Sequence, residues 1–561
     1  MTDQKHIIKR QVIELGLTSS ENAFQIQDDV SRNFKNVIIP LLQKIFDEIS
    51  SPDEVLKIDT LCLDLGSIDV SDLSHQLSTN VKEQIKEVLI PQIELKRSGS
   101  KLPSEVEKRF LDQEEQVVGL HIKSKNLSEI EKVLHFLKTG TLPWWGNKGD
   151  YFTLEKSIQK LLLEDPKNLI ICLKEQSVFR NYQNRLINNC SDFRLLNLLQ
   201  KINPNAKTVT TKGALFIQAL KKKNRLDFGT RQKVWNYTFD IALRKDLGTT
   251  DLQNEDAFLG FLIALQNDST IDKNYTNELT KSNNWKRTIK RLTDALSRSN
   301  SELKPAWKTI FLDAVLDKNY ILVDKISNVL QNATLLKGDE WDKLISEVKK
   351  RGDKGLINTL STILDKGHSL KKESWENQLK EAVNNNTIIA PKEEFLEEIY
   401  IENAGLILCW NYLSIFFKEF KLVKDKEFVD ENAAQRAVHI LQYMATKEEN
   451  VSEHELALNK ILCGLPVDNP ISIDFKLTDL EKEECENLLQ AVLDNWKVLK
   501  NTSPQSLRET FLIKEGILTK RGSEWHLRLE RTAVDMLIDK LPWNISMINL
   551  PWNDNILHVT W

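Results

Sequence analysis

The pair His454-Glu455 is the place in this chain where residue types and spacing come closest to a catalytic motif. A zinc protease needs a second histidine four residues after the first, so that both imidazoles lie on one helix face and hold the metal. Position 458 is a leucine, so the metal would lack that ligand. We therefore expect His454 and Glu455 on the exposed face of a helix, whose buried side is formed by Leu456, Leu458, Ile461 and Leu462.

Other residue types that support chemistry are also poorly placed. His439 lies between two apolar residues, which indicates a core or interface histidine. Neighbouring acids such as Glu483 and Glu484 diverge on a helix and cannot share a proton. A phosphate loop would need glycine at position 145, where the chain has tryptophan. We predict that the protein is not an enzyme, has no catalytic or metal site, and requires no cofactor, metal or nucleotide.

Length and composition limit the class of protein. The chain has 561 residues, more than one hydrophobic core supports, so we expect roughly two to four domains. Its net charge is −4, which argues against a basic field for nucleic acid. We expect no membrane span and no signal peptide, because no apolar segment is long enough. The six cysteines form no Cys-x-x-Cys pair, which predicts reduced thiols in a cytosol.

The first part of the chain is predicted to form a β-α-β-α unit over residues 1–98. Apolar residues at alternate positions predict strands over 6–17 and 55–68. The apolar phase of the second strand shifts near Thr60, which indicates a bulge or a strong twist.

Two helices complete this predicted unit. Apolar residues three or four positions apart predict a helix over 34–49, which Pro40 should kink. A second helix is predicted over 73–89, before Pro91. Residues 99–126 are polar and charged, and we interpret them as a linker.

Helical apolar spacing continues nearly throughout residues 127–390, which we predict as a helical, repeat-like region. Trp307, Trp341 and Trp375 lie 34 residues apart, and each opens a similar segment. This period is the length of a helix-pair repeat, although coincidence among the thirteen tryptophans is the alternative.

The last part of the chain is predicted to contain a helical region, 391–500, and an α/β cap, 501–561. The helical region opens with an apolar helix from about position 399. The cap is predicted to contain strands over 525–530, 545–550 and 557–561 and a helix over 534–541. The expected fold is mainly α, with a solenoid-like middle between two small α/β ends, for which one shared sheet is a possible arrangement.

Five tryptophans are candidates for a structural or partner-binding role. Trp144 and Trp145 lie in the loop of FLKTGTLPWWG, residues 136–146. Trp543 and Trp552 each follow Leu-Pro, and Trp561 closes the chain. Large rings in stiff proline turns either pack the loop on its neighbours or contact a partner. Both interpretations remain open, and we expect Trp543 and Trp552 to be packing residues.

Several of these segments together resemble the tape-measure family of contractile injection systems, which are phage-tail-like particles. The resemblance covers roughly residues 1–145 and 395–561. It is carried by His-Ile-Ile at 6–8, IDTLCLDLG at 58–66, FLKTGTLPWWG at 136–146, AVHILQYMATKEENVSEHELALNKILCGLPVDNPI at 437–471, NTSPQSLRETFLIKEGIL at 501–518, the two Leu-Pro-Trp turns and the closing ILHVTW.

The resemblance implies a structural and assembly role, in which the protein acts as a tape measure that sets the length of the inner tube. It implies inner tube and baseplate proteins as partners, with cargo as a further candidate. The protein would be cytoplasmic during assembly and would then lie within the particle, with release together with the particle as an open alternative. The residues alone leave two other hypotheses open: a helical-repeat adaptor or chaperone that binds client proteins, and a hydrolase.

Overall fold

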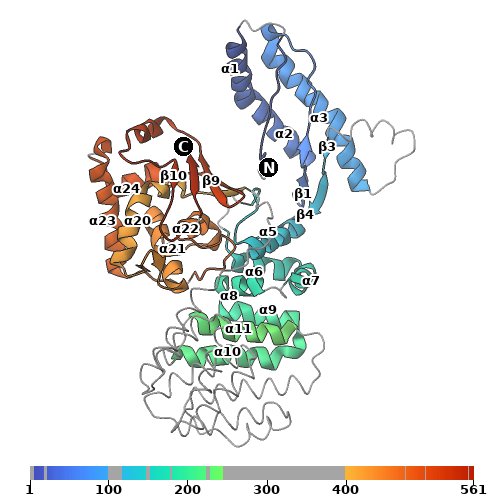
Figure 1. Cartoon of the computed structure of the whole chain (residues 1–561). Coiled ribbons are helices and arrows are strands. Elements are labelled where there is room, and N and C mark those ends of the chain that lie inside the picture. The colour runs from blue at the N-terminus through green and yellow to red at the C-terminus, as the bar shows by residue number, and fades with distance from the viewer. Residues whose placement is uncertain are drawn as a thin grey trace, which may run out of the picture. The chain divides into compact units, whose positions relative to one another are not determined.

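The computed structural model describes residues 5–17, 22–98, 117–146, 152–176, 180–222, 228–243, 398–473, 475–499, 501–553 and 555–561 (Figure 1). The chain divides into two compact units. The first contains residues 1–133, 144–149 and 160–169, and the second contains 134–143, 150–159 and 170–561. Helices predominate and the sheets are small, so the predicted mainly α class with small α/β units is confirmed. The solenoid-like middle stays a prediction.

The helices of the first unit pack around one apolar cluster, which includes Ile45, Ile85 and Leu89. In chain order they are α1 (Ala23–Asn33), the π-helical η1 (Phe34–Ile38), α2 (Ile39–Ile49), the 3₁₀ turn η2 (Val70–Asp72) and α3 (Leu73–Ser98). Pro40 has no N–H to donate, and the perturbation expected there takes the form of η1 immediately before it. Pro91 lies inside α3, so the prediction that this helix ends before Pro91 is wrong.

Four short strands of the first unit form two small antiparallel pairs. β1 (Glu54–Lys57) pairs with β4 (His121–Ser124), and β2 (Thr60–Leu61) pairs with β3 (Val117–Val118). The single strand predicted over 55–68, with a bulge or twist near Thr60, is instead two short strands, β1 and β2, and Thr60 begins the second. Gly119 has a φ of +69°, and a Cβ there would lie 2.1 Å from Asp59 Oδ2. β3 and β4 lie within the predicted linker, so that interpretation is wrong for residues 117–126.

The strand predicted over residues 6–17 is also wrong. These residues are extended but pair with no strand among the described residues, and Ile13, Leu15 and Leu17 are each more than 40% exposed. The segment is held near its start, where His6 Nε2 and Asp47 Oδ1 are 2.7 Å apart and the ring of His6 meets that of Phe46. Alternating apolar residues form a strand only where a partner strand supplies hydrogen bonds.

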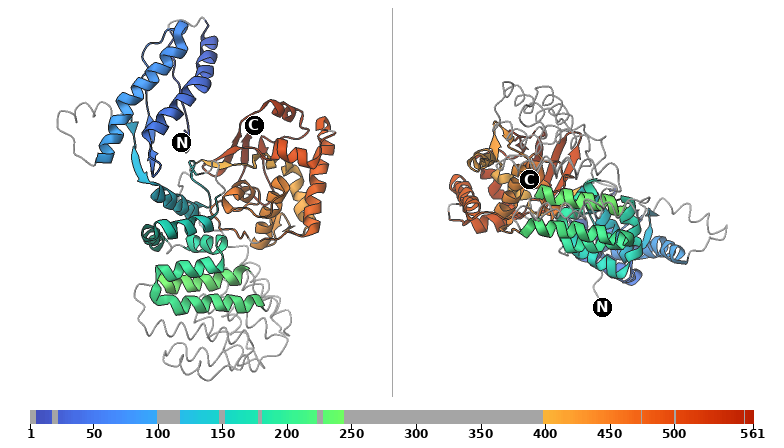
Figure 2. Two further views of the ribbon diagram at one scale, coloured as in Figure 1. Left: turned by 180° about the vertical axis from the view of Figure 1, so that it is seen from behind. Right: turned by 90° about the horizontal axis from the view of Figure 1, so that it is seen from below.

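The other described helices before residue 244 are shared between the two units. They are α5 (Lys125–Thr139), α6 (Leu154–Glu164), α7 (Pro166–Gln176), α8 (Arg180–Asn189), α9 (Asp192–Ile202), the 3₁₀ turn η3 (Pro204–Ala206), α10 (Lys207–Lys222) and α11 (Phe228–Leu243). Helices α5, α6 and α7 lie partly in each unit, and the rest belong to the second unit. Helices α9, α10 and α11 lie side by side, as both sides of the molecule show (Figures 1 and 2). We call the second unit up to residue 243 the helical part. The 34-residue repeat at 307, 341 and 375 lies outside the described residues.

We call residues 398–561 the C-terminal part. Its helices surround one apolar core that runs from Ile399 to Val559. They are η4 (Ala404–Cys409), α20 (Trp410–Glu419), α21 (Glu431–Thr446), η5 (Glu453–Leu456), α22 (Ala457–Leu462), α23 (Asp479–Asn495), η6 (Lys497–Leu499), α24 (Pro504–Leu507), the π-helical η7 (Arg508–Leu512) and the 3₁₀ helix η8 (Ala533–Lys540). A small hairpin, β6 (Val423–Lys424) and β7 (Glu427–Phe428), follows α20.

A five-stranded sheet closes this core, in the order β10-β11-β9-β8-β5. The strands are β5 (Ile399–Ile401), β8 (Gly516–Arg521), β9 (Glu524–Leu529), β10 (Met547–Ile548) and β11 (Leu557–Thr560). β11 runs parallel to β9, while every other neighbouring pair is antiparallel. The strands predicted near 525–530, 545–550 and 557–561 are therefore confirmed, the second as a shorter strand, and the helix predicted over 534–541 is the 3₁₀ helix η8.

Three predictions that involve this part are wrong. Residues 399–401 form strand β5 instead of the start of a helix, and β5 pairs with β8. The regions 391–500 and 501–561 therefore share one sheet and one core, so the predicted boundary at residue 500 does not separate two folded bodies. We also predicted that the two ends of the chain could share one sheet. Within the described residues, the strands of the first unit and those of the C-terminal part lie in different sheets, so this prediction is wrong.

Candidate functional site: a buried ionic junction

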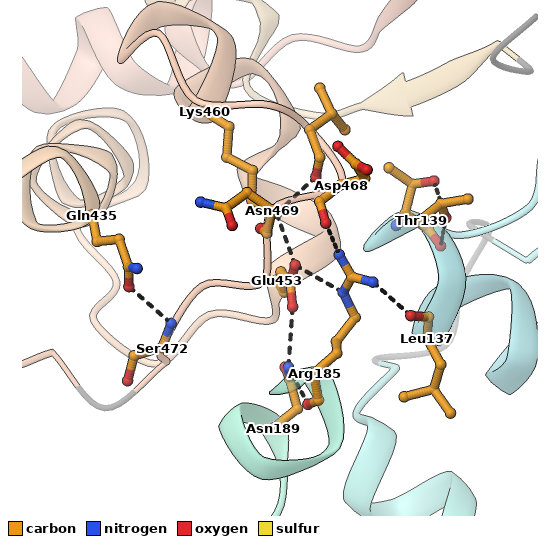
Figure 3. A network of polar contacts seen from close by, with 12 residues as sticks. Leu137, Thr139, Arg185, Asn189, Gln435, Glu453, Lys460, Asp468, Asn469 and Ser472 are labelled. Atoms are coloured by element: carbon orange, nitrogen blue, oxygen red, sulfur yellow. Dashed lines mark hydrogen bonds and ion pairs between the residues drawn. The ribbon is translucent and has the colours of Figure 1, made fainter. Parts of the chain in front are cut away.

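Three charged side chains meet in the interior of the second unit, and one of them is distant in sequence from the other two (Figure 3). Arg185 lies on α8, Glu453 opens η5, and Lys460 lies on α22. Their exposed fractions are 0%, 0% and 1%. Charged residues are almost never this buried unless they are paired. We call these three residues the ionic junction.

Every polar group of the junction has a close partner. Arg185 Nε lies 3.0 Å from Glu453 Oε1, and its two terminal nitrogens donate to Leu137 O and Asp468 O at 2.6 Å each. Lys460 Nζ donates to Glu453 Oε1 at 2.8 Å and to the carbonyls of residues 467 and 469. The amide of Asn189 donates to Glu453 Oε2 at 3.1 Å. Two cations thus share one carboxylate, and backbone carbonyls accept their remaining donors.

The local sequence of the C-terminal part explains how Glu453 and Lys460 meet. Ser452 caps η5 through a capping box with Glu455, which fixes the start of the helical segment and the position of Glu453. Lys460 follows seven residues later, about two helical turns on, so both side chains lie on the same face. Here Lys460 Nζ also reaches the carbonyls of the loop that follows α22.

Electrostatics keep this junction charged. Burial alone would raise the pKa of Glu453, but the Lys460 ammonium and the Arg185 guanidinium outweigh it and hold the pKa of Glu453 below its ordinary value. Burial lowers the pKa of Lys460, and Glu453 opposes that shift. The arrangement is an ion triad with one net positive charge. It stabilises one specific pairing of the helical and C-terminal parts. None of its three charged groups is free to act as an acid or a base.

The FLKTGTLPWWG segment meets this junction. The carbonyl of Leu137 accepts from Arg185, and Gly140 ends α5 with a φ of +76°. A Cβ at Gly140 would lie 2.7 Å from Glu453 Oε1 and 3.0 Å from an Arg185 terminal nitrogen. Only glycine therefore lets the backbone approach the ion triad this closely in this conformation. Two segments that carried the family resemblance, 136–146 and 437–471, are thus joined at one buried site.

Comparison with known proteins identifies the family of the chain. The family model described as contractile injection system tape measure protein matches residues 5–561. The chain belongs to this family. No curated protein and no solved structure matched. Because the match spans the whole described chain, it includes both segments of the ionic junction of this tape measure protein and all five candidate tryptophans. The role of the family is structural.

Sequence reasoning missed the three junction residues of the tape measure protein and misplaced two of their neighbours. His454 and Glu455 are half-buried instead of exposed, and the ring of His454 meets those of Phe136 and Phe152 at centroid distances of 6.4 and 5.6 Å. The prediction that Leu456, Leu458, Ile461 and Leu462 are buried is confirmed. A charged Lys460 inside this apolar run was the one signal that could have indicated a buried ion pair.

Three properties of the described residues bear on metal binding, thiol chemistry and membrane insertion. No group of three His, Cys, Asp or Glu side chains among them could hold a metal. None of the six cysteines forms a disulfide, and Cys190, Cys409, Cys463 and Cys485 are buried. No described helix combines the length and the apolar character that crossing a membrane requires.

The five candidate tryptophans lie at separate places. Trp144 and Trp145 are half-buried in the first unit. Trp543 Nε1 donates to Leu408 O at 3.1 Å, and Trp552 Nε1 donates to Leu462 O at 2.9 Å. Trp561 packs against the same core, and its carbonyl accepts from Arg531. The two Leu-Pro-Trp turns thus attach the C-terminal sheet to η4 and α22, as packing residues would.

Replacing Trp552 with alanine is expected to destabilise the C-terminal part by about 2–3 kcal/mol. The ring is half-buried and contacts Phe417 and Phe428 at centroid distances of 5.6 and 5.2 Å, so the cost is lower than for full burial. W552F is the matched control, because it keeps an aromatic ring while it loses the N–H and part of the ring area. Thermal melts of both variants test this. An unchanged melting temperature in W552A would mean that the ring serves a partner instead.

His439 gives the stability of this part a predictable pH dependence. Burial lowers its pKa to about 4, helped by the charges of Lys460 and Arg436 and opposed by the bond to Ser472 O. The folded pKa lies below the unfolded value of about 6.5, so neutral His439 stabilises the fold above that pH. About 3 kcal/mol is lost as the pH falls from about 6.5 to 4.

The variant H439Q tests this pH dependence. Its side-chain amide can still donate to Ser472 O but carries no titrating group. Unfolding by urea, followed from pH 7 to pH 4, should show a flatter pH profile in H439Q than in the wild type. The same loss of stability in both proteins would assign the acid sensitivity to other groups.

Proposed function

We propose that this tape measure protein sets the length of the inner tube of a contractile injection particle. The observation that carries the proposal is the family match over residues 5–561. The mainly helical fold supports it, because helices give a chain a fixed rise of about 1.5 Å per residue and hence a defined length. The match gives no support to the adaptor alternative.

We further propose that its partners are the inner tube and baseplate proteins, with cargo as an additional candidate. The chain would assemble with them in the cytoplasm and then remain within the particle. Trp144 and Trp145 remain candidates for a partner contact, because they are half-buried and keep part of their ring surface accessible.

Deleting residues 307–340, one 34-residue period, tests the length-setting role. The deletion removes one period in frame and leaves both end segments intact. Particles from the deletion strain should be uniformly shorter in electron micrographs. The point variant W307A is the control, because it alters the same segment at constant chain length and should leave particle length unchanged. Particles of normal length in the deletion strain would contradict the proposed function.

A further inference from the structure

We propose that the ionic junction is a releasable clasp, which holds the tape measure closed before assembly and opens when the chain extends in the tube. The proposal rests on the proposed ruler function. It concerns the conformation of the ruler, and its first test needs no particle.

While the ionic junction is closed, the chain cannot attain its full extended length. Arg185 and Glu453 are 268 positions apart in sequence, yet their side chains are in direct contact. The intervening chain therefore returns to its starting point. As a continuous helix, the same stretch would span about 400 Å at 1.5 Å per residue. A ruler that acts along its length cannot use this stretch while Arg185 is bound to Glu453.

The junction is built so that its two sides can separate. Lys460 and Glu453 both belong to the C-terminal part, and Lys460 keeps its bond to Glu453 and to two local carbonyls without Arg185. When Arg185 leaves, water can reach the Glu453 carboxylate and the Asp468 carbonyl, while Arg185 becomes a hydrated cation on α8. Neither side is left with an unpaired buried charge, which is what normally makes breaking a buried ion pair costly.

Further contacts between the helical part and the C-terminal part stabilise the closed form, in which Arg185 is bound to Glu453, until a partner protein binds. Ser452 Oγ donates to Phe152 O at 2.8 Å, and the ring of His454 meets those of Phe136 and Phe152. A tube or baseplate protein opens the clasp only if it binds the open form more tightly than the closed one. Opening is therefore coupled to assembly in the wild-type protein, where Arg185 adds to these contacts; without Arg185 they are too few to hold the two sides together.

The variant R185M tests the clasp in the purified full-length protein. Methionine retains an apolar side chain and removes the guanidinium, while the Glu453–Lys460 pair remains. R508M is the matched control: Arg508 is 1% exposed and binds Glu486 and Met444 O, all within the C-terminal part. Small-angle X-ray scattering should show a radius of gyration larger by roughly a third in R185M, at unchanged helix content, and no such rise in R508M.

Two scattering results would overturn the clasp: a wild-type radius of gyration in R185M, or an equal increase of the radius of gyration in R508M.

Particle length gives the second test. R185M particles should have the wild-type length, because the clasp is already open in the finished tube. Longer R185M particles would show that the wild-type ruler stays closed, which contradicts the proposal. The scattering result stands even if the 307–340 deletion leaves particle length unchanged, so failure of the ruler and failure of the clasp are distinguishable.

Discussion

Replacing Glu453 with glutamine should cost about 3–5 kcal/mol in the stability of the C-terminal part, because the substitution leaves two buried cations without their shared carboxylate. Lys460 stays buried within that part whether or not Arg185 is bound, so opening of the junction relieves only part of the cost. Native-state hydrogen exchange can measure this as faster exchange of the amides of η5 and α22. The effect is the largest that we expect from any single substitution in the described residues.

Glu455→Gln is the matched control for Glu453→Gln. It lies on the same 3₁₀ segment, is half-buried, and accepts from the backbone N–H of Ser452, which glutamine can also do. Burial raises the pKa of Glu455 to about 7, so its loss of charge at neutral pH is partial. The control should change stability by less than about 1 kcal/mol. If the amides of α22 exchange at the same rate in Glu453→Gln and in the wild type, water reaches the ionic junction and the charges of the junction are not buried.

The C-terminal sheet shows which elements sequence periodicity predicts well. Trp525, Leu527 and Leu529 alternate with polar residues, and all three are buried in β9. Leu557 and Val559 do the same in β11. Such alternation identifies a strand where one sheet face is covered. The same pattern failed at residues 6–17, because periodicity gives no information about whether a partner strand is present.

Short or distant features could not be predicted in this way. Residues 399–401 are too few and too uniformly apolar to separate strand from helix by period, and only pairing with β8 decides. Arg185 and Glu453 contact each other across 268 positions, and neither stands in a motif that indicates burial. Gly140 ends α5, but its close approach to the ion triad depends on a segment more than 300 residues later.

Particle length should change in proportion to the length of the ruler, and this is the second prediction with a large expected effect. Removing residues 307–340 and, in a separate strain, duplicating them gives three chains that differ by 34 residues each. If the segment acts as continuous helix, each step changes the length by about 50 Å. If it acts as a stacked helix pair, each step changes it by only about 10 Å. We expect the step of about 50 Å, because an open clasp leaves the segment extended.

The slope of mean tube length against residue number, measured by electron microscopy across these three strains, is the most direct test of the ruler. The account predicts narrow length distributions in all three strains and a straight line with a slope near 1.5 Å per residue. Tubes of the same length in all three strains would contradict it.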